Sequence, residues 1–290
     1  MCRQEIDGYS CQDYLHQYNK EAAMPGSPRK KIAVDREVRS KLVDWCYSIV
    51  DFCHFNRETV SMAISYLDRF LLCELGLVTL TEPAIYQLAA MTALYTAIKI
   101  HEPEAMDPEL ISNLSHGAYT IEQVEQMESC ILQAIDWRVN TPTALAFVRL
   151  FLSLVPNKVM DKATKAATYD LTINQTEYAV KDYKFVTVKA STVGFVSLMN
   201  ALESLCVDSK TYDYVAQLLS KVINVDPESR HILEMQHYLY PKTIEHSCFE
   251  DSPAYLDKNE SKSSKASTQH DPNFGSSSPC SAFESFSSIP

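Results

Sequence analysis

The segment Val38–Leu72 constrains the fold of this chain most, because it holds two amphipathic helical patterns with charged residues beside their apolar stripes. The first stripe comprises Val38, Leu42, Trp45, Cys46, Ile49 and Cys53. The second comprises Val60, Ala63, Ile64, Leu67 and Leu71. Arg39 and Asp68 lie next to these stripes, and a charge that close to a core needs a partner. We therefore expect Arg39 and Asp68 to form a structural ion pair buried between two helices.

The chain is expected to be helical up to about Tyr240. It contains only six glycines, and β-hairpin turns depend on glycine. Capping residues mark helix starts at Asp35, at Asn56, at Thr81 before Pro83, and at Thr120, which forms a T-x-x-Q capping box with Gln123. With a short helix at Pro108–Leu114, five helices are predicted between Asp35 and Trp137. A separate N-terminal helix is predicted near Glu5–Tyr18.

A second set of helices is predicted in the following hundred residues. Thr141 precedes Pro142 at the first helix, and the later helices fit Val159–Asn174, Ala190–Leu202, Tyr212–Ile223 and Pro227–His237. The uncharged segment Pro83–Ile98 and the segment Ala190–Leu202 lie about a hundred residues apart, as two repeats would require. We therefore predict an all-α fold. It has an N-terminal helix and linker at 1–34, five-helix repeats at 35–140 and 141–241, and a disordered Ser/Pro-rich tail at 242–290.

Composition argues against several classes of protein. The chain has 26 Lys and Arg against 37 Asp and Glu, and a net charge of −11 disfavours a nucleic-acid surface. Pro83–Ile98 is shorter than the roughly 20 residues that span a bilayer, so no membrane segment is expected. Cys46, Cys53 and His54 are of the residue types that bind metals, but the two cysteines belong to the apolar stripe and are expected to pack in the core. We expect no metal, no cofactor and the reduced cysteines typical of nucleus or cytoplasm.

Two further charges, Lys99 and Glu128, lie at the margins of apolar stripes. Lys99 closes the uncharged segment that begins at Pro83, and Glu128 shares a helical face with Val124 and Ile131. A lysine and a glutamate in such positions are expected to meet at one edge of the protein. The spacing alone favours a structural ion pair over a binding site.

Two short motifs in the segment Val38–Leu72 resemble the cyclin box. They are VRSKLVDW, which begins at Val38, and SYLDRFL, which ends at Leu71. The resemblance implies a cyclin fold, with a regulatory subunit that has no catalysis of its own. Such a subunit binds a cyclin-dependent Ser/Thr kinase and activates it allosterically to regulate the cell cycle.

The same resemblance assigns the kinase-binding residues. AIKIHE, at 97–102, aligns with the family's segment around a kinase-contacting lysine, which implies that role for Lys99. QMES, at 126–129, aligns with the contacting glutamate, which implies that role for Glu128. By the same alignment Ile100, Leu132 and Val139 add apolar contacts. The resemblance thus favours a binding site over a purely structural pair.

Two other sites are predicted. Many cyclins dock substrates and inhibitors that carry an Arg-x-Leu motif, and Val38, Leu42, Trp45 and Gln87 match that patch. Lys41 and Ser48 depart from the family there, which weakens docking of a basic peptide, and Leu42 and Trp45 could equally be core residues. Ser27, followed by Pro28, Arg29 and Lys30, is a possible phosphorylation site for a proline-directed kinase.

Two alternatives were weighed against a kinase regulator. A cyclin-fold transcription-related protein, such as a general transcription factor that binds DNA, would need a basic face, which the net charge of −11 disfavours. An enzyme would need a catalytic motif. The sequence contains no Gly-rich phosphate loop, H-E-x-x-H, G-x-S-x-G or protein-kinase signature.

Overall fold

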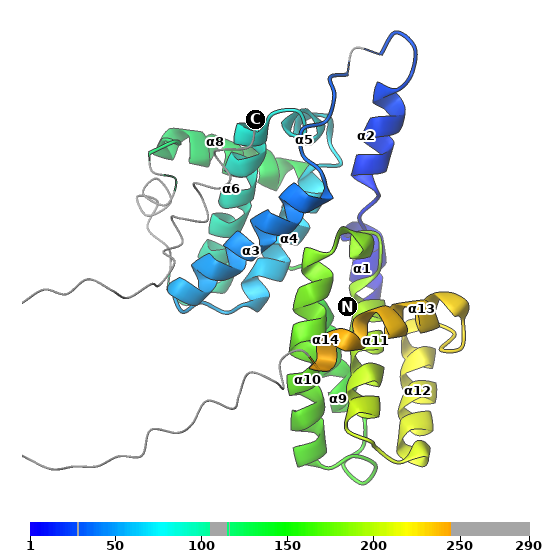
Figure 1. The fold of residues 1–290 in the computed structure, drawn as a ribbon. Helices are drawn as coiled ribbons and strands as arrows, with labels where there is room; N and C mark the ends of the chain where they lie inside the picture. Colours follow the sequence, from blue (N-terminus) through cyan, green and yellow to red (C-terminus); the bar gives the residue numbers. More distant parts are fainter. Residues whose placement is uncertain (28, 105–114, 116, 245–290) are drawn as a thin grey trace, which may run out of the picture.

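The structure is a computed structural model that describes residues 1–27, 29–104, 115 and 117–244. Within these ranges the chain forms helices and turns and no β-strand. Figure 1 shows two helical bundles, one above the other. The first bundle contains α3 (Arg36–Phe52), α4 (Glu58–Phe70), α5 (Glu74–Thr79), α6 (Pro83–His101) and α8 (Ile121–Ala134). The second contains α9 (Ala144–Leu154), α10 (Lys162–Lys181), the 3-10 helix η1 (Tyr183–Phe185), α11 (Ala190–Ser204), α12 (Ser209–Ile223), α13 (Arg230–Leu239) and α14 (Pro241–Ile244).

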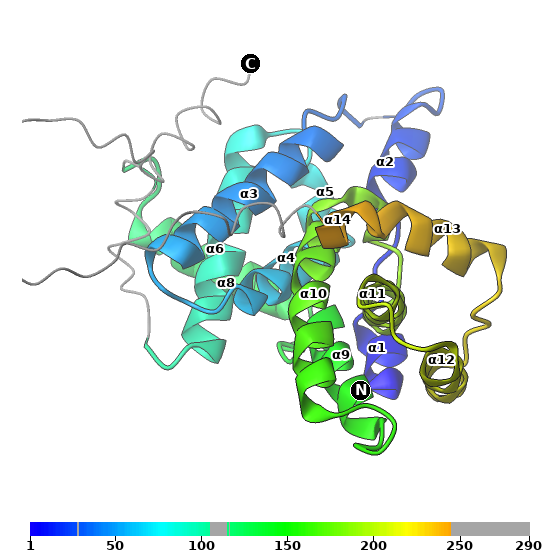
Figure 2. The same ribbon diagram turned by 60° about the horizontal axis from the view of Figure 1, so that its bottom comes forward.

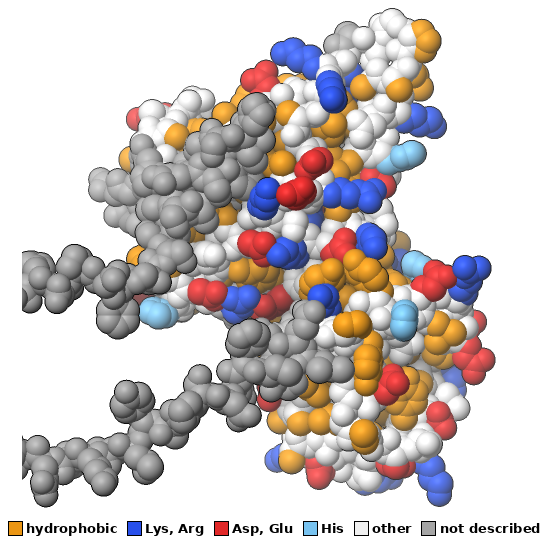
Figure 3. All heavy atoms as spheres, viewed as in Figure 1, with side chains coloured by type: hydrophobic (Ala, Val, Ile, Leu, Met, Phe, Trp, Pro, Cys, Tyr) orange, Lys and Arg blue, Asp and Glu red, His pale blue; other side chains and the backbone are white. Residues whose placement is uncertain are grey.

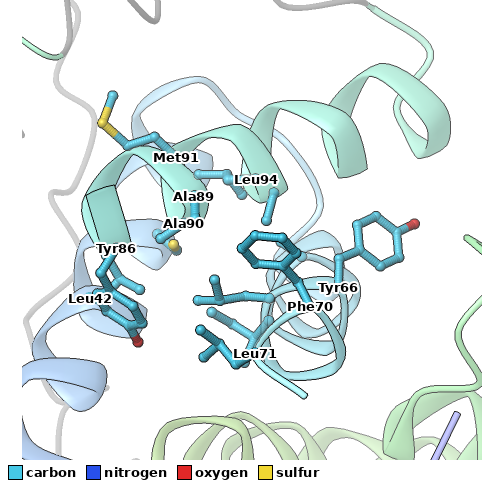
Figure 4. Packing of buried hydrophobic residues seen from close by; sticks show 14 of the residues in the cluster. Leu42, Tyr66, Phe70, Leu71, Tyr86, Ala89, Ala90, Met91 and Leu94 are labelled. Atoms are coloured by element: carbon cyan, nitrogen blue, oxygen red, sulfur yellow. The ribbon is translucent and has the colours of Figure 1, made fainter. Parts of the chain in front are cut away.

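Each bundle is built around one helix that is buried on all sides. In α6 every residue from Tyr86 to Ile98 is buried, and in α11 every residue from Ser191 to Leu202 is buried. Figure 4 shows Phe70 of α4 packed against α6, where small alanines let the two helices approach closely. Gly194 plays the same part in α11, because a Cβ atom there would lie 2.7 Å from the carbonyl oxygen of Ala144. The predicted central helices are confirmed.

Two of the predicted helix caps are confirmed by hydrogen bonds. The Asp35 carboxylate accepts from the Val38 N–H at 2.9 Å at the start of α3. The capping box of α8 is complete. The Gln123 N–H donates to Thr120 Oγ1 at 3.3 Å, and the Thr120 N–H donates to Gln123 Oε1 at 2.9 Å. At α4, Asn56 Oδ1 accepts from the Glu58 N–H at 2.9 Å, one residue before the helix cap.

Two other predicted caps are wrong. The helix α6 is preceded by Glu82, while the Thr81 hydroxyl donates to the Val78 carbonyl at 2.9 Å, just before the end of α5, a helix that the sequence did not predict. The cap of α9 is Thr143, whose Oγ1 accepts from the Ala146 N–H at 3.0 Å. Thr141 instead donates to Ser65 Oγ at 3.3 Å. At α6 the Glu82 side chain makes no capping hydrogen bond, whereas at α9 Thr143 caps the helix and Thr141 bonds across to α4.

The N-terminal segment contains two helices where the sequence predicted one, α1 (Cys2–Gly8) and α2 (Tyr14–Ala22). They dock on different bundles (Figure 1). Glu5 of α1 accepts from the N–H and hydroxyl of Ser191 in the second bundle, at 2.7 and 2.6 Å. The Tyr14 hydroxyl of α2 donates to Asp68 in the first bundle at 2.9 Å. The predicted helix at Pro108–Leu114 lies outside the described residues, as does the predicted tail beyond α14.

The predicted ion pair between Arg39 and Asp68 is present and buried. Arg39 Nε and Nη2 donate to the two carboxylate oxygens of Asp68 at 3.1 and 2.7 Å, and the side chains are 3% and 9% exposed. Arg39 Nη1 donates to the carbonyls of Val180 and Lys181, at 3.0 and 3.2 Å. Burial disfavours the charged form, but Asp68 outweighs it and holds the pKa of Arg39 above its ordinary value. The Arg39 guanidinium thus joins α3 and α4 of the first bundle to the end of α10.

Further ion pairs cross between the bundles. Arg57 pairs with Glu177 at 2.7 Å, and Arg149 pairs with the buried Glu58 at 2.8 Å. Figure 3 shows acidic and basic side chains interspersed in a band across this face, where the two bundles meet. These contacts hold α10 and α9 against the start of α4.

We expect Arg39→Ala to lower the free energy of unfolding by about 3–5 kcal/mol, because it leaves the Asp68 carboxylate buried without its cation. Lys41→Ala is the matched control, since Lys41 is an exposed cation on the same helix and its pair with Glu37 at 3.0 Å is exposed. The measurement is denaturant unfolding of both variants. An Arg39→Ala variant as stable as Lys41→Ala would contradict the role of this pair.

Candidate functional site

Lys99 and Glu128 meet at one edge of the first bundle. Lys99 lies in the last turn of α6 and Glu128 lies in the middle of α8, which packs against α6. Lys99 Nζ lies 3.0 Å from Glu128 Oε2 and 3.4 Å from Oε1. The lysine side chain is 50% exposed and the glutamate side chain 14%. The proximity predicted from the sequence is therefore confirmed, while the kinase-binding role stays a prediction.

The Glu128 carboxylate also contacts the hydroxyl of Thr96, a residue that the sequence did not single out. The Thr96 hydroxyl lies 3.2 Å from Glu128 Oε1 and 2.8 Å from the carbonyl oxygen of Thr92. Thr96 is fully buried, and its single hydroxyl proton has two acceptors, of which the Thr92 carbonyl is the nearer. The hydrogen bond from Lys99 to Glu128 raises the pKa of the lysine, which therefore stays charged at neutral pH.

The three apolar residues assigned to the same site differ in exposure. Ile100 is 41% exposed, Leu132 is buried, and Val139 is half-buried. The Val139 carbonyl accepts from the Tyr66 hydroxyl at 2.6 Å and lies 3.3 Å from His101 Nε2. These contacts tie the segment after α8 to the end of α6. All five predicted residues therefore belong to two adjoining helices and the segment that follows one of them.

The sequence did not identify one exposed residue in the turn after α8. Trp137 is 66% exposed and adopts a left-handed backbone conformation with φ 57°, directly after Asp136 with φ 53°. The Trp137 N–H donates to the Leu132 carbonyl at 2.9 Å, which ends α8. Left-handed residues are uncommon outside glycine, and the sequence offers no glycine here to signal such a turn.

The predicted docking patch is buried in this structure. Val38 and Gln87 are each 8% exposed, Trp45 is 5% exposed, and Leu42 is 1% exposed. Gln87 Oε1 also accepts from the Tyr119 hydroxyl at 3.1 Å. Of the two interpretations left open by the sequence, this burial favours the one in which Leu42 and Trp45 belong to the core.

The predicted phosphorylation site lies in the connection between α2 and α3. Ser27 is half-buried, and its hydroxyl oxygen accepts from the Arg29 N–H at 3.3 Å. The Arg29 side chain pairs with Glu21 at 2.7 Å and lies over the Tyr18 ring. Pro28 lies outside the described residues, and modification of Ser27 stays a prediction.

The described part of the chain holds no group of three or more His, Cys, Asp or Glu side chains that could bind a metal ion. Cys46 is buried, and burial raises the pKa of its thiol to about 12, which suits a packing role. None of the described helices has both the length and the apolar character needed to cross a membrane.

The chain is similar to one known protein family and to several known proteins. Residues 9–140 match the family described as "Cyclin, N-terminal domain". Cyclin-A1-2 of Arabidopsis thaliana is 26% identical over 196 residues, which cover 64% of this chain and 42% of that protein. The G2/mitotic-specific cyclin-B of Drosophila melanogaster is 29% identical over 201 residues, covering 67% of this chain and 34% of that protein. This chain thus spans less than half the length of these relatives.

Solved structures share the fold. A viral cyclin from herpesvirus saimiri superimposes with a TM-score of 0.55 at 14% identity, covering 81% of this chain and 97% of the viral one. A chain of the CAK complex from Chaetomium thermophilum bound to ATP-gamma-S superimposes with a TM-score of 0.50 at 12% identity, covering 88% of this chain and 96% of that one. Identities this low support a shared fold alone. Residues 9–140 thus belong to the family of cyclin N-terminal domains, and the two helical bundles share the fold of a solved viral cyclin.

Proposed function

We propose that this chain binds a cyclin-dependent Ser/Thr protein kinase and activates it allosterically to regulate the cell cycle. The observation that supports this most directly is the ion pair between Lys99 and Glu128, which lies at an exposed edge beside Ile100. In cyclins a lysine and glutamate at these aligned positions contact the kinase. The net charge of −11 gives no support to the alternative of a DNA-binding transcription protein.

The pair is suited to exchanging partners. An exposed ion pair contributes less than about 1 kcal/mol to the free energy of unfolding. Little stability is therefore lost when the two side chains bind another molecule instead of each other. The ammonium of Lys99 carries three donors and can meet backbone carbonyls, while the carboxylate of Glu128 accepts from backbone N–H groups. A helix end presents such unsatisfied groups. One lysine and one glutamate at 3.0 Å can therefore hold a partner helix by its main chain.

Exposed apolar side chains flank the pair. Ile100 follows Lys99 and is 41% exposed, and Trp137, in the turn after α8, is 66% exposed, while Leu132 belongs to the core of the first bundle and Val139 packs against that core. Large apolar side chains exposed beside polar anchors are typical of protein-binding surfaces, where aromatic residues carry much of the affinity. We therefore include Trp137 in the proposed interface, although the sequence did not assign it.

Activation would follow from a shift in the kinase population. In a protein kinase one helix carries a glutamate that must move inward to pair with the lysine that positions the ATP phosphates. A cyclin that binds the inward arrangement more tightly raises its population by that difference in affinity. The proposed role of Lys99 and Glu128 is to supply part of this difference, and catalysis stays with the kinase.

The decisive experiment compares stability with kinase activation. We expect Lys99→Ala and Glu128→Ala to melt within a few degrees of the wild type, because the pair is exposed on the lysine side. Both variants should lose kinase activation. In the complex with the kinase the polar contact would be buried, and removal of one partner of such a contact costs about 2–5 kcal/mol of binding free energy. The measurements are thermal melts, pull-downs and kinase assays against candidate kinases that the wild type activates.

Arg230→Ala provides the control for this comparison. Arg230 and Glu234 form an exposed ion pair at 2.6 Å on α13, in the other bundle, so its loss should affect neither stability nor activation. If Lys99→Ala and Glu128→Ala activate the kinase as well as Arg230→Ala does, the proposed site is refuted. If they unfold instead, the pair is structural.

Docking of Arg-x-Leu motifs is a weaker candidate function, because the residues concerned are buried. We expect Trp45→Ala to lower the free energy of unfolding by about 3–5 kcal/mol, as truncation of a large aromatic core residue does. Lys41→Ala should change it by no more than about 0.5 kcal/mol. Denaturant unfolding measures both. A stable Trp45→Ala variant that loses binding to an Arg-x-Leu peptide would instead support the dock.

A further inference from the structure

The turn after α8 carries a strongly exposed aromatic side chain on an unusual backbone. Trp137 is 66% exposed, more than any other large hydrophobic residue that the structure describes. Asp136 and Trp137 both adopt left-handed conformations, with φ 53° and 57°. Such conformations are uncommon outside glycine, most of all for bulky residues, and they persist only where surrounding contacts hold them. The contacts that hold this turn therefore decide where the Trp137 side chain lies.

Side chains of α4 hold this turn by two consecutive carbonyls. Arg69 Nη2 donates to the Arg138 carbonyl at 2.9 Å, and the Tyr66 hydroxyl donates to the Val139 carbonyl at 2.6 Å. Figures 1 and 2 show α4 alongside α6 in the first bundle. Figure 4 shows the Tyr66 ring turned away from Phe70, with its hydroxyl outside the apolar cluster. The turn is thus attached to a helix whose own position is set by the core.

His101, the last residue of α6, joins the same contact. Its Nε2 lies 2.8 Å from the Tyr66 hydroxyl oxygen and 3.3 Å from the Val139 carbonyl oxygen. The hydroxyl of Tyr66 uses its single proton on the Val139 carbonyl, and a carbonyl oxygen can only accept. Nε2 must therefore carry a hydrogen, which the charged ring or the neutral ring protonated at Nε2 provides. His101 thus completes a bridge from α6 through α4 to the turn.

The end of α6 is divided between residues that face solvent and residues that bind the fold. The Lys99 side chain is 50% exposed, and Ile100 is 41% exposed. The next two side chains contact the α4 region instead. His101 reaches the Tyr66 hydroxyl, and the Glu102 carboxylate accepts from the N–H of residue 56, just before α4, at 3.0 Å. These two contacts fix the helix end from which Lys99 and Ile100 extend.

We propose that His101 is a positioning residue of the proposed kinase-binding surface and holds the turn with Trp137 in a fixed place relative to Lys99. Lys99 precedes His101 by two residues, and Trp137 precedes Val139 by two residues, so the bridge joins the two parts of that surface. This role rests on the proposed function, because it concerns the same surface. A turn that is already ordered in the free chain lowers the entropy that binding costs, so His101 raises the affinity without touching the kinase.

The test compares two substitutions of His101. His101→Leu removes the N–H donor, whereas His101→Gln keeps an N–H donor at a similar reach. The Val139 carbonyl keeps its bond from Tyr66 in both, so both variants should melt within a few degrees of the wild type. His101→Leu should bind a kinase that the wild type activates about three- to tenfold more weakly, the cost of ordering one large side chain on binding. His101→Gln should bind like the wild type, and so should the control His231→Leu, which replaces an exposed histidine of α13.

Two measurements on the free chain need no kinase. The sequence has two tryptophans, and the other one, Trp45, is 5% exposed. Time-resolved fluorescence anisotropy of each protein, compared with its Trp137→Phe counterpart, isolates the motion of Trp137. This motion should be faster in His101→Leu than in the wild type or His101→Gln. In alkaline buffer, where histidine rings are neutral, nitrogen NMR of the wild type should find the remaining ring proton of His101 on Nε2.

Unchanged kinase affinity or unchanged Trp137 motion in His101→Leu overturns the proposal, and so does a His101→Gln variant that is as weak as His101→Leu. If His101→Leu does not fold, the ring proton decides: on Nδ1 it overturns the proposal, and on Nε2 it supports it. Lys99→Ala keeps the two proposals apart. If Lys99→Ala loses kinase binding and His101→Leu keeps it, only the role of His101 fails. If Lys99→Ala binds like the wild type, the proposed function fails, and the motion of Trp137 in the free chain still decides whether His101 holds the turn.

Discussion

The arrangement of the two bundles depends on one guanidinium. Arg39 lies on α3, pairs with Asp68 of α4, and donates to two carbonyls at the end of α10 in the other bundle. The last carbonyls of a helix have no partner within it, so Arg39 also completes the end of α10. Tyr14 of α2 adds a hydrogen bond to the same carboxylate, and the N-terminal segment is thereby joined to the same centre. A hydrophobic core can tolerate sliding of helices, whereas a forked donor with fixed partners cannot.

The sequence predicted those parts of the fold in which a local pattern and the tertiary structure agree. A charge within an apolar stripe identified Arg39 and Asp68, and the T-x-x-Q pattern placed the start of α8. The predicted cap of α9 was wrong because Thr141 and Thr143 are both suited to cap a helix. Which of them does so depends on contacts across the bundles, since Thr141 donates to Ser65 and Thr143 accepts from the Ala146 N–H. The prediction of one N-terminal helix was wrong for a related reason. The helices α1 and α2 dock on different bundles, and the helical periodicity of the sequence does not indicate such a break.

The candidate site was predictable in its polar part only. Lys99 and Glu128 lie at the edges of apolar stripes, so helix packing brings them together, and the structure places them 3.0 Å apart. Trp137 depends on a left-handed turn without glycine, and no local rule marks it.

Two ion pairs of the first bundle, Arg39 with Asp68 and Lys99 with Glu128, differ in what their surroundings permit. Arg39 and Asp68 are almost fully buried and every oxygen of Asp68 has a donor, so neither residue can leave the other without a large loss. Lys99 is half exposed, and water already competes for its ammonium. Its backbone nevertheless belongs to α6, the most deeply buried helix of the bundle, and the side chain of Glu128 is only 14% exposed. A side chain that is free to change partner thus extends from a backbone that is held in place, and this combination keeps the ordering cost of binding low.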